Sequence, residues 1–428
     1  MHKKIVLTNG LRVILVPRAS TSAFTVLIAF KAGSIDETND IAGIFHFFEH
    51  MTYKGSKKRK TPYDVAEYMD SIGGEHNAYT GKEYTAYYVK ASSQHFEQAL
   101  DFLSDNILHP LLPESEIEKE KNVILEELKT YEDIPQDKVK ELFEEAIFGE
   151  SKIGKPIIGR KDSISAISKE KIKSYQDKYY YPENAVIAIA GSIPNNENKI
   201  VALIEKYFEF ISSDLTLNRR AIEKVYGKRI VVKKQKTEQS NIVIGFKVPG
   251  SESKEWYALK LLAKIIGGSM SSRMFNNIRE KLGLAYFVST SYCDYRNFGY
   301  IATRAGVDND KVDLAIRSIV NEYQKVLTGG LNDRELLNAK EMFRGSIAID
   351  MEDSEFLAED YALTELIEEK IEPPEELMKK YDTITRKDVE IVANKYIKDF
   401  YAAAIGPRVS KDKIAPLITN NQTPITSK

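Results

Sequence analysis

The sequence has few of the features that mark secreted or membrane-bound proteins. It holds one cysteine, Cys293, in 428 residues, so it cannot form an internal disulfide. It has no apolar run of about 18 residues, the length that a membrane-spanning helix needs. Residues 1–4, Met-His-Lys-Lys, lead directly into a short strand and not into an apolar helix. We therefore expect no signal peptide, no membrane contact and a cytoplasmic location.

An excess of charge of one sign is also absent. The chain has 61 Lys and Arg residues against 63 Asp and Glu residues, a formal net charge of −2, and the two signs are interspersed. Nothing in this balance favours nucleic acid as a partner. The length, in contrast, exceeds the roughly 250–300 residues at which single hydrophobic cores stop growing. The chain is therefore expected to form two domains.

Histidine is scarce, yet two of the six histidines fall in one pentapeptide, His46-Phe47-Phe48-Glu49-His50. On a helix, His46 and His50 lie one turn apart on the same face, and Glu49 lies beside them. Zinc prefers nitrogen, sulfur and carboxylate oxygen ligands, and a catalytic zinc site keeps one position for water. This order of residues, His-x-x-Glu-His, is the inverted form of the metallopeptidase helix motif. It predicts a catalytic zinc site.

A third ligand is available in the acidic segment 114–132, which reads as a helix. Glu120 and Glu127 fall two turns apart and share a face, so one can bind a metal while the other orients a ligand. Such acidic runs, taken alone, are more typical of a solvated helix face. The spacing does not decide which of the two glutamates is the ligand.

Residues 45–55, Phe-His-Phe-Phe-Glu-His-Met-Thr-Tyr-Lys-Gly, resemble the motif of the pitrilysin, insulinase and mitochondrial processing peptidase family, although Tyr53 stands where Phe is commoner. Glu127 also follows at about that family's distance. The resemblance implies one Zn²⁺ per chain. It assigns the metal ligands (His46, His50 and Glu127), the general base (Glu49) and a second acid that orients a ligand (Glu120).

A second segment that resembles the family is Asn77-Ala78-Tyr79-Thr80, followed by the alternating run 84–89, which reads as a strand. The resemblance implies that residues 77–80 form an exposed edge strand, to which a peptide substrate adds as a further strand, with Asn77 near the scissile bond. His76 is a conceivable ligand, but an ordinary strand position is favoured. The tyrosines nearby are favoured as sheet-packing residues.

A third segment, 272–286, carries Arg279 and Tyr286. In the family that it resembles, an Arg and Tyr pair at this spacing reaches the zinc site. Arg279 is then expected to hold a substrate carbonyl, and Tyr286 to donate a hydrogen bond to the oxyanion of the tetrahedral intermediate. Without the resemblance, Arg279 reads as a surface residue of a charged helix.

An internal repeat supports two homologous domains. Residues 167–172 and the strand 185–191 correspond to residues 384–389 and the strand 401–406, and Ser168 and Thr385 are matching helix N-caps. A further match, of residues 116–121 with residues 335–340, has a shift of 219 and places Glu120 opposite Ala339 and Glu127 opposite Ser346, so the second half lacks the acidic ligands. We predict a catalytic zinc-binding domain at 1–212, a linker at 213–228 and a non-zinc domain at 229–428.

Strands alternate with helices in both halves. A hairpin is expected from 5–7 and 11–16 around Asn9-Gly10, with further strands at 24–32, 229–235 and 241–248 and a helix at 258–266. These patterns favour an α+β fold of two homologous domains, each a mainly antiparallel sheet with helices packed on one face, as in the mitochondrial processing peptidases.

The predicted function is that of a zinc-dependent endopeptidase, in which Glu49 activates the zinc-bound water that attacks the scissile carbonyl of unfolded oligopeptides or processing peptides. Members of the family enclose the substrate between four such domains. A chain with two domains is therefore expected to form a homodimer. The alternative is a non-catalytic structural subunit or a subunit that works only with a partner; the intact metal residues argue against the first of these.

Overall fold

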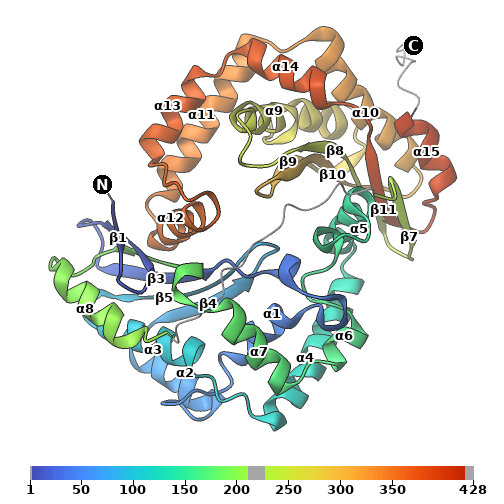
Figure 1. The fold of residues 1–428 in the computed structure, drawn as a ribbon. Coiled ribbons are helices and arrows are strands. Elements are labelled where there is room, and N and C mark those ends of the chain that lie inside the picture. Colours follow the sequence, from blue (N-terminus) through green and yellow to red (C-terminus); the bar gives the residue numbers. More distant parts are fainter. Residues whose placement is uncertain (1, 211–226, 420–428) are drawn as a thin grey trace. The chain divides into compact units, whose positions relative to one another are not determined.

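The computed structural model describes residues 2–210 and 227–419, and these form two compact units (Figure 1). Unit 1 joins residues 2–128, 156–210 and 347–373, and unit 2 joins residues 129–155, 227–346 and 374–419. Each half of the chain thus gives one segment to the unit built mainly by the other half. The prediction of two contiguous domains did not include this exchange. Of the predicted linker, 213–228, only Gly227 and Lys228 lie within the described residues.

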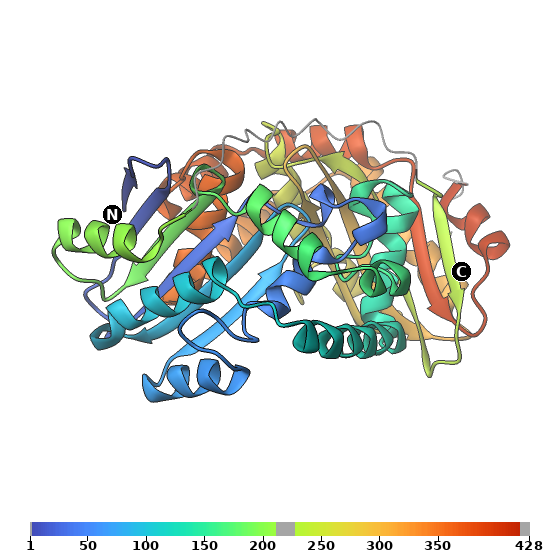
Figure 2. The same cartoon turned by 60° about the horizontal axis from the view of Figure 1, so that its bottom comes forward.

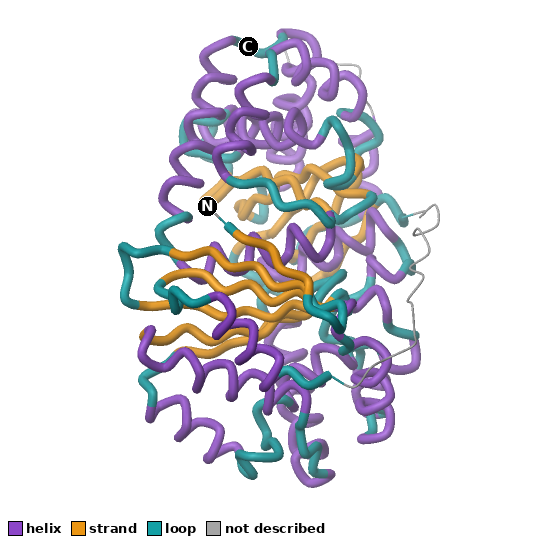
Figure 3. Tube along the Cα trace, turned by 60° about the vertical axis from the view of Figure 1, so that its left-hand side comes forward, coloured by secondary structure: helices purple, strands orange, loops and turns teal. Residues whose placement is uncertain are grey.

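Unit 1 is built on a six-stranded sheet with the order β1-β2-β6-β3-β5-β4. All neighbouring strands are antiparallel except β2 and β6, which are parallel. Figure 3 shows these strands as adjacent segments. The predicted hairpin around Asn9-Gly10 is formed by β1 and β2. The strands are β1 (Lys3–Val6), β2 (Arg12–Pro17), β3 (Ala23–Phe30), β4 (Glu75–Thr80), β5 (Thr85–Ser92) and β6 (Ala185–Gly191).

Helices cover both faces of this sheet, not one face as the sequence suggested. Most of them form one layer, which Figure 2 turns toward the viewer, and α12 packs against the opposite face (Figure 1). The sequence held a sign of this, because β3 and β6 are almost continuously apolar and buried along their length. The helices of unit 1 are α1 (Ile44–Met51), α2 (Pro62–Ser71), α3 (Phe96–Leu108), α4 (Glu114–Asp133, which ends in unit 2), α6 (Lys161–Ser165), α7 (Lys169–Tyr179), α8 (Glu197–Tyr207) and α12 (Ser354–Glu368).

Two hydrophobic cores result in unit 1. The larger one lies between the sheet and the main helical layer, and the smaller one lies under α12, where Leu357, Tyr361 and Leu366 meet the other face of the strands. A buried carboxylate also fixes α12: Glu365 pairs with Arg12 of β2 and with Lys4 of β1. The apolar face of α12 therefore finds its partner strands some 160 residues or more away in sequence, where no local pattern points.

Unit 2 repeats the arrangement with one strand fewer, in the order β7-β11-β8-β10-β9. Strands β7 and β11 are parallel and the other neighbours are antiparallel. The strands are β7 (Ile230–Lys234), β8 (Gln239–Pro249), β9 (Ala285–Asp294), β10 (Phe298–Asp308) and β11 (Tyr401–Gly406). The helices are α5 (Pro135–Phe148), α9 (Trp256–Gly267), the π-helix η6 (Phe275–Lys281), α10 (Val312–Gly329), α11 (Asp333–Asp350, which ends in unit 1), α13 (Pro374–Thr383), α14 (Arg386–Tyr396) and α15 (Lys411–Thr419).

The segment that unit 2 receives from the first half carries α5, which packs against β7, β8 and β11. It is the counterpart of α12 in unit 1. The two matching N-caps predicted from the repeat are present: the Ser168 side chain accepts a hydrogen bond from the N–H of Lys171, and the Thr385 side chain accepts one from the N–H of Asp388. Among the described residues, no helix combines the length and the apolar composition of a membrane span.

Candidate metal site and substrate strand

The apolar and polar side chains of helix α1 lie on different faces of the helix. Its apolar residues are buried in the larger core of unit 1: Ile44, Phe45, Phe47, Phe48 and Met51. The helix contacts β4 and α7. Because the apolar residues fill the inward positions, His46 and His50 are left together on another face, one turn apart, as the sequence predicted.

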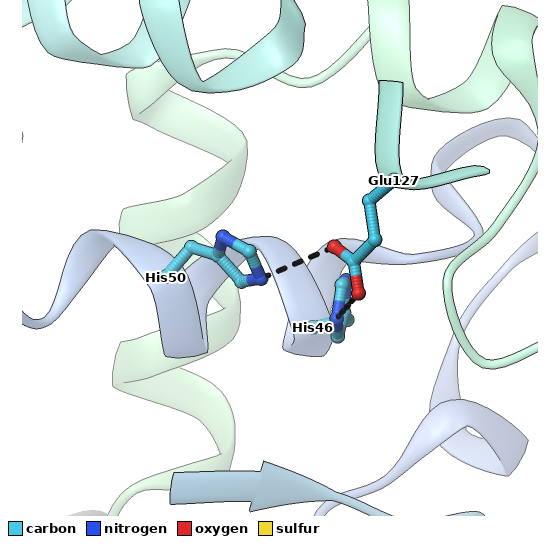
Figure 4. A group of neighbouring side chains, drawn as sticks. All are labelled: His46, His50 and Glu127. Atoms are coloured by element: carbon cyan, nitrogen blue, oxygen red, sulfur yellow. Dashed lines mark ion pairs between the residues drawn. The ribbon is translucent and has the colours of Figure 1, made fainter. Parts of the chain in front are cut away.

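The two histidines face Glu127 of α4 (Figure 4). The Nε2 atom of His46 lies 3.7 Å from one carboxylate oxygen of Glu127, and the Nε2 atom of His50 lies 3.6 Å from the other. One ligand atom from each residue falls within 4.8 Å of the other two, the only such group of three that the described residues contain. The Oε2 atom of Glu127 is buried and has no hydrogen-bond partner. This donor set fits a metal ion with nitrogen and oxygen ligands.

Glu120 lies behind His50. Its Oε1 atom is 2.8 Å from Nδ1 of His50, and its Oε2 atom is 2.8 Å from the ammonium group of Lys54. Burial alone favours the neutral form of Glu120, but the contacts with His50 and Lys54 outweigh it and lower the pKa of Glu120. A carboxylate in this place holds the His50 ring with Nε2 turned toward Glu127. The arrangement is the one that orients histidine ligands in metal proteins.

The electrostatics of the two histidines differ. Burial lowers the pKa of His46 to about 3, so its imidazole is neutral and has a lone pair to offer. Burial acts in the same direction on His50, but Glu120, Glu127 and Glu49 together raise the pKa of His50. Burial also raises the pKa of Glu127. Three carboxyl groups around two imidazoles create a negative site that favours a cation.

Glu49 is held by the neighbouring strand. The hydroxyl of Thr80, at the end of β4, donates a hydrogen bond of 2.5 Å to Oε2 of Glu49. Burial raises the pKa of Glu49 above its ordinary value, and the hydroxyl of Thr80 opposes that rise. A carboxyl group whose proton affinity is raised toward neutral pH is suited to accept and release a proton during a reaction.

The predicted substrate strand is β4, at the end of the unit 1 sheet. Strand β5 is its only neighbour among the described strands, which leaves its other edge unpaired. Side chains alternate along it: Ala78 and Thr80 face the larger core and Glu49, whereas Tyr79 packs on the α12 side. The side chain of Asn77 accepts a hydrogen bond from the N–H of Ala78. Substrate binding by residues 77–80 stays a prediction.

His76 is outside the metal cluster, in agreement with the favoured reading. Its ring contacts the rings of Tyr53 and Phe102, at centroid distances of 4.8 and 5.2 Å. The same Tyr53 donates a hydrogen bond from its hydroxyl to the backbone carbonyl of Asn77, at 3.2 Å. Tyr53 therefore ties the end of α1 to β4.

Arg279 and Tyr286 belong to unit 2. Arg279 lies in the π-helix η6, and Tyr286 is the second residue of β9, with 74% of its surface exposed. The guanidinium of Arg279 lies 4.7 Å from the ring centroid of Phe275 and 6.0 Å from that of Tyr286. The two residues are thus neighbours within their unit, and Arg279 lies on a kind of helix that is frequent at functional sites. Their action on a substrate stays a prediction.

Sequence reasoning did not single out Lys54 or the hydrogen bond from Thr80 to Glu49. Lys54 had a weak local signal, because it follows His50 by only four residues, although α1 ends at Met51 and Lys54 lies beyond it. Thr80 had none, because its contact with Glu49 depends on how β4 packs against α1.

The comparisons with known proteins agree with this geometry. The family model for insulinase, peptidase family M16, matches residues 12–161, and the model for the peptidase M16 inactive domain matches residues 166–343. The chain belongs to peptidase family M16. The residues that form the metal cluster all lie within the first match.

Relatives and solved structures cover nearly the whole chain. An uncharacterised zinc protease of Bacillus subtilis is 32% identical over 95% of this chain and 98% of its own length, and one of Rickettsia felis is 34% identical over 94% and 96%. The crystal structure of a protease from Helicobacter pylori superimposes with a TM-score of 0.85 at 25% identity, covering 95% of this chain and 99% of that chain. A Pseudomonas fluorescens structure described as a peptidase M16 inactive domain, 18% identical with a TM-score of 0.87, shares the fold. The names of the Bacillus subtilis and Rickettsia felis relatives support zinc as the cofactor.

Proposed function

We propose that this member of the family is a zinc-dependent endopeptidase whose active site lies in unit 1. The observation that carries the proposal is the group formed by His46, His50 and Glu127, whose ligand atoms lie within 4.8 Å of one another. Glu49 adjoins this group and interacts electrostatically with both His50 and Glu127. A metal-binding group beside a carboxyl group of raised pKa is what hydrolysis of an amide requires.

This chain by itself contains three residues that can bind the metal. His46 and His50 would supply Nε2 atoms, and Glu127 would supply a carboxylate oxygen, one zinc ion per chain. When bound, zinc lowers the pKa of water and polarises a carbonyl group. Glu120 keeps the His50 ring oriented through Nδ1, and Lys54 keeps Glu120 in place.

Glu49 is the residue that moves the proton. Thr80 engages Oε2 of Glu49, so we assign Oε1 as the atom that takes a proton from the attacking water and later gives it to the leaving amine. The raised pKa of Glu49, caused first by burial, brings its proton affinity closer to that required for both steps.

The unpaired edge of β4 supports an extended peptide as the substrate. A peptide that adds to this edge gains main-chain hydrogen bonds with little demand on its sequence, and its side chains alternate between the two faces of the sheet. Residues 77–80 would bind such a peptide, and Arg279 and Tyr286 would stabilise the developing negative charge on the scissile carbonyl oxygen. Unfolded oligopeptides or processing peptides are therefore the proposed substrates.

The test is metal content together with cleavage of a quenched random peptide pool, before and after chelation and return of zinc. We expect about one zinc per chain and cleavage that disappears with the chelator and returns with zinc. Bound zinc without cleavage would favour the alternative of a subunit that needs a partner. A protein without zinc affinity would overturn the proposal.

We also propose that the chain forms a homodimer, because members of the family enclose their substrates between four domains and this chain supplies two. Sedimentation of the active, zinc-loaded protein at micromolar concentration tests this. A species of twice the chain mass of 48.6 kDa is expected, and an active monomer would contradict the proposal.

A further inference from the structure

The metal-bearing helix α1 begins without a cap of its own. Its N-cap residue, Gly43, has no side chain to satisfy the first N–H groups, and a side chain is not tolerated there. Gly43 has a φ of 95°, and a Cβ atom at this position would lie 2.4 Å from the carbonyl oxygen of Ile158. The close approach of residues 158–159 therefore forces glycine at the N-cap, the position where α2, for example, places the side chain of Thr61.

Glu37 supplies the missing cap from outside the helix. Its Oε2 atom accepts a hydrogen bond of 2.7 Å from the N–H of Gly43, and its Oε1 atom accepts one of 3.0 Å from the N–H of Phe45. Both oxygens are thus used as acceptors, as in a carboxylate. When it is ionised, Glu37 also interacts favourably with the helix dipole.

This cap carries a large desolvation penalty, because Glu37 is only 5% exposed. Burial raises the pKa of Glu37 to about 8, against the lowering effects of the two N–H groups and of Lys82. Exposed side chains cap other helices of unit 1 with a smaller desolvation penalty, as Thr61 caps α2 and Asn196 caps α8. Proteins keep costly buried polar groups most often where function requires them.

Glu37 also connects α1 to the turn that follows the predicted substrate strand. The short 3-10 helix Ser34–Asp36, next to Glu37, is bound to that turn: the N–H of Ser34 donates to the carbonyl of Gly81, and the N–H of Ile35 donates to the carbonyl of Lys82. This turn directly follows Thr80, whose hydroxyl holds Glu49. The contacts therefore form a closed ring, from Glu49 through β4 and its turn to Glu37 and back to the first turn of α1.

We propose that Glu37 is a positioning residue, which sets the place of the His46 and His50 helix relative to Glu127 and β4 through the N–H groups of Gly43 and Phe45. It acts through α1 and does not touch the metal cluster. The proposal rests on the metal site proposed above and deepens it.

The test compares zinc affinity, measured by competition with a chelating dye, and the absorption spectrum of the Co²⁺-substituted protein in Glu37→Gln and Glu37→Asp variants. The amide of Gln places an N–H₂ group against one of the two helix N–H groups, and Asp withdraws the carboxylate by one methylene. We expect about a tenfold or larger loss of zinc affinity in Glu37→Gln, with an altered Co²⁺ spectrum, and a smaller loss in Glu37→Asp.

Thr61→Ala is the matched control, because it removes a helix cap in the same unit without touching the ring of contacts. It should lower the melting temperature and leave zinc affinity and the Co²⁺ spectrum unchanged. The proposal is overturned if Glu37→Gln binds zinc within about twofold of the wild type with the same spectrum, or if Thr61→Ala loses affinity as Glu37→Gln does. If Glu37→Gln does not fold, Glu37→Asp is judged by the same criteria. Failure of the wild type to bind zinc would instead overturn the proposed function.

Discussion

The two units share one arrangement of sheet and helices, which we call the frame, but they differ in the side chains that the frame carries. In unit 1 the metal helix α1 contacts the edge strand β4 and helix α7, and in unit 2 helix α9 makes the equivalent contacts with the edge strand β9 and helix α14. Yet α9, with the sequence Trp-Tyr-Ala-Leu-Lys-Leu-Leu-Ala-Lys-Ile-Ile-Gly, carries neither histidine nor carboxylate. The fold therefore provides an equivalent helix in each unit, but among the described residues only α1 presents side chains of a metal-binding group.

The positions of the acidic residues differ in the same way. On α11, the counterpart of α4, Ala339 is buried where Glu120 lies in unit 1, and Ser346 stands where Glu127 does. On α9, the ammonium group of Lys260 lies 3.9 Å from the ring centroid of Trp256, a cation–π contact within the helix. Unit 2 therefore shares the apolar pattern that builds the sheet and helices, and its described residues lack a counterpart of the group formed by His46, His50 and Glu127.

The strongest test of this difference is His50→Ala. If unit 1 alone binds zinc, this substitution should remove all bound zinc and all peptide cleavage, because two of the three ligands do not hold the ion in a tetrahedral site. His76→Ala is the control, since His76 lies in the same unit outside the cluster, and it should keep its zinc. Elemental analysis after dialysis is the measurement. Zinc at full occupancy in His50→Ala would place a metal elsewhere and break the comparison.

The Glu49→Gln variant tests the role of Glu49 in catalysis separately from zinc binding. We expect zinc content to stay the same while kcat falls about 10²–10⁴-fold, the usual contribution of a general acid–base residue. Steady-state kinetics on a quenched peptide, paired with zinc analysis of the same sample, checks this. The exposed Glu75 on β4, changed to Gln, serves as a control that should keep its activity. Near-normal turnover in a zinc-loaded Glu49→Gln protein would remove Glu49 from this role.

Glu120→Ala gives unit 1 the alanine that unit 2 has at the corresponding position, Ala339. Zinc affinity should fall about 10–100-fold, because His50 loses the group that orients its Nδ1 atom. Glu120→Gln, which keeps the volume and one acceptor, should lose less. Both variants can be titrated with zinc against a chelating dye. Unchanged affinity in Glu120→Ala would mean that this difference between the units has no bearing on the metal.

The smallest effects should come from the shared frame. Ser168→Ala in α7 and Thr385→Ala in α14 remove corresponding N-caps, and each should cost about 1 kcal/mol of stability without changing zinc affinity. Denaturant unfolding of the two variants gives both values. A cost confined to one of them would show that the two units do not depend equally on the same local contacts.

Much of the frame was predictable, because its signals are local. The Asn9-Gly10 hairpin, the strands at 185–191 and 401–406 and the matching caps follow from turn chemistry, apolar runs and side-chain acceptors within a few residues. The metal helix was predictable for the same reason. His46, Glu49 and His50 lie within one turn of each other, so the helical period alone brings the two histidines together.

The exchange of helices between the units was not predictable in this way. The segment with α12 is amphipathic, and its sequence reveals that it has an apolar face but not which sheet will cover that face. The structure gives it to unit 1, through Leu357 and Leu366 in the core and through Glu365 at Arg12. Such a choice depends on surfaces that form only when distant strands have paired.

The sequence by itself determined the two candidate histidine ligands and a choice of two candidate glutamates, together with the two-fold repeat and the α+β fold. Each of these follows from spacings of a few residues or from a repeated order. Only the tertiary structure decided that Glu127, and not Glu120, faces both histidines, that Thr80 holds Glu49 and that Glu37 caps α1. In a helix, residues two turns apart share a face, so spacing cannot rank Glu120 against Glu127. Their different roles follow from how α4 packs against α1, which places one beside both Nε2 atoms and the other behind the His50 ring.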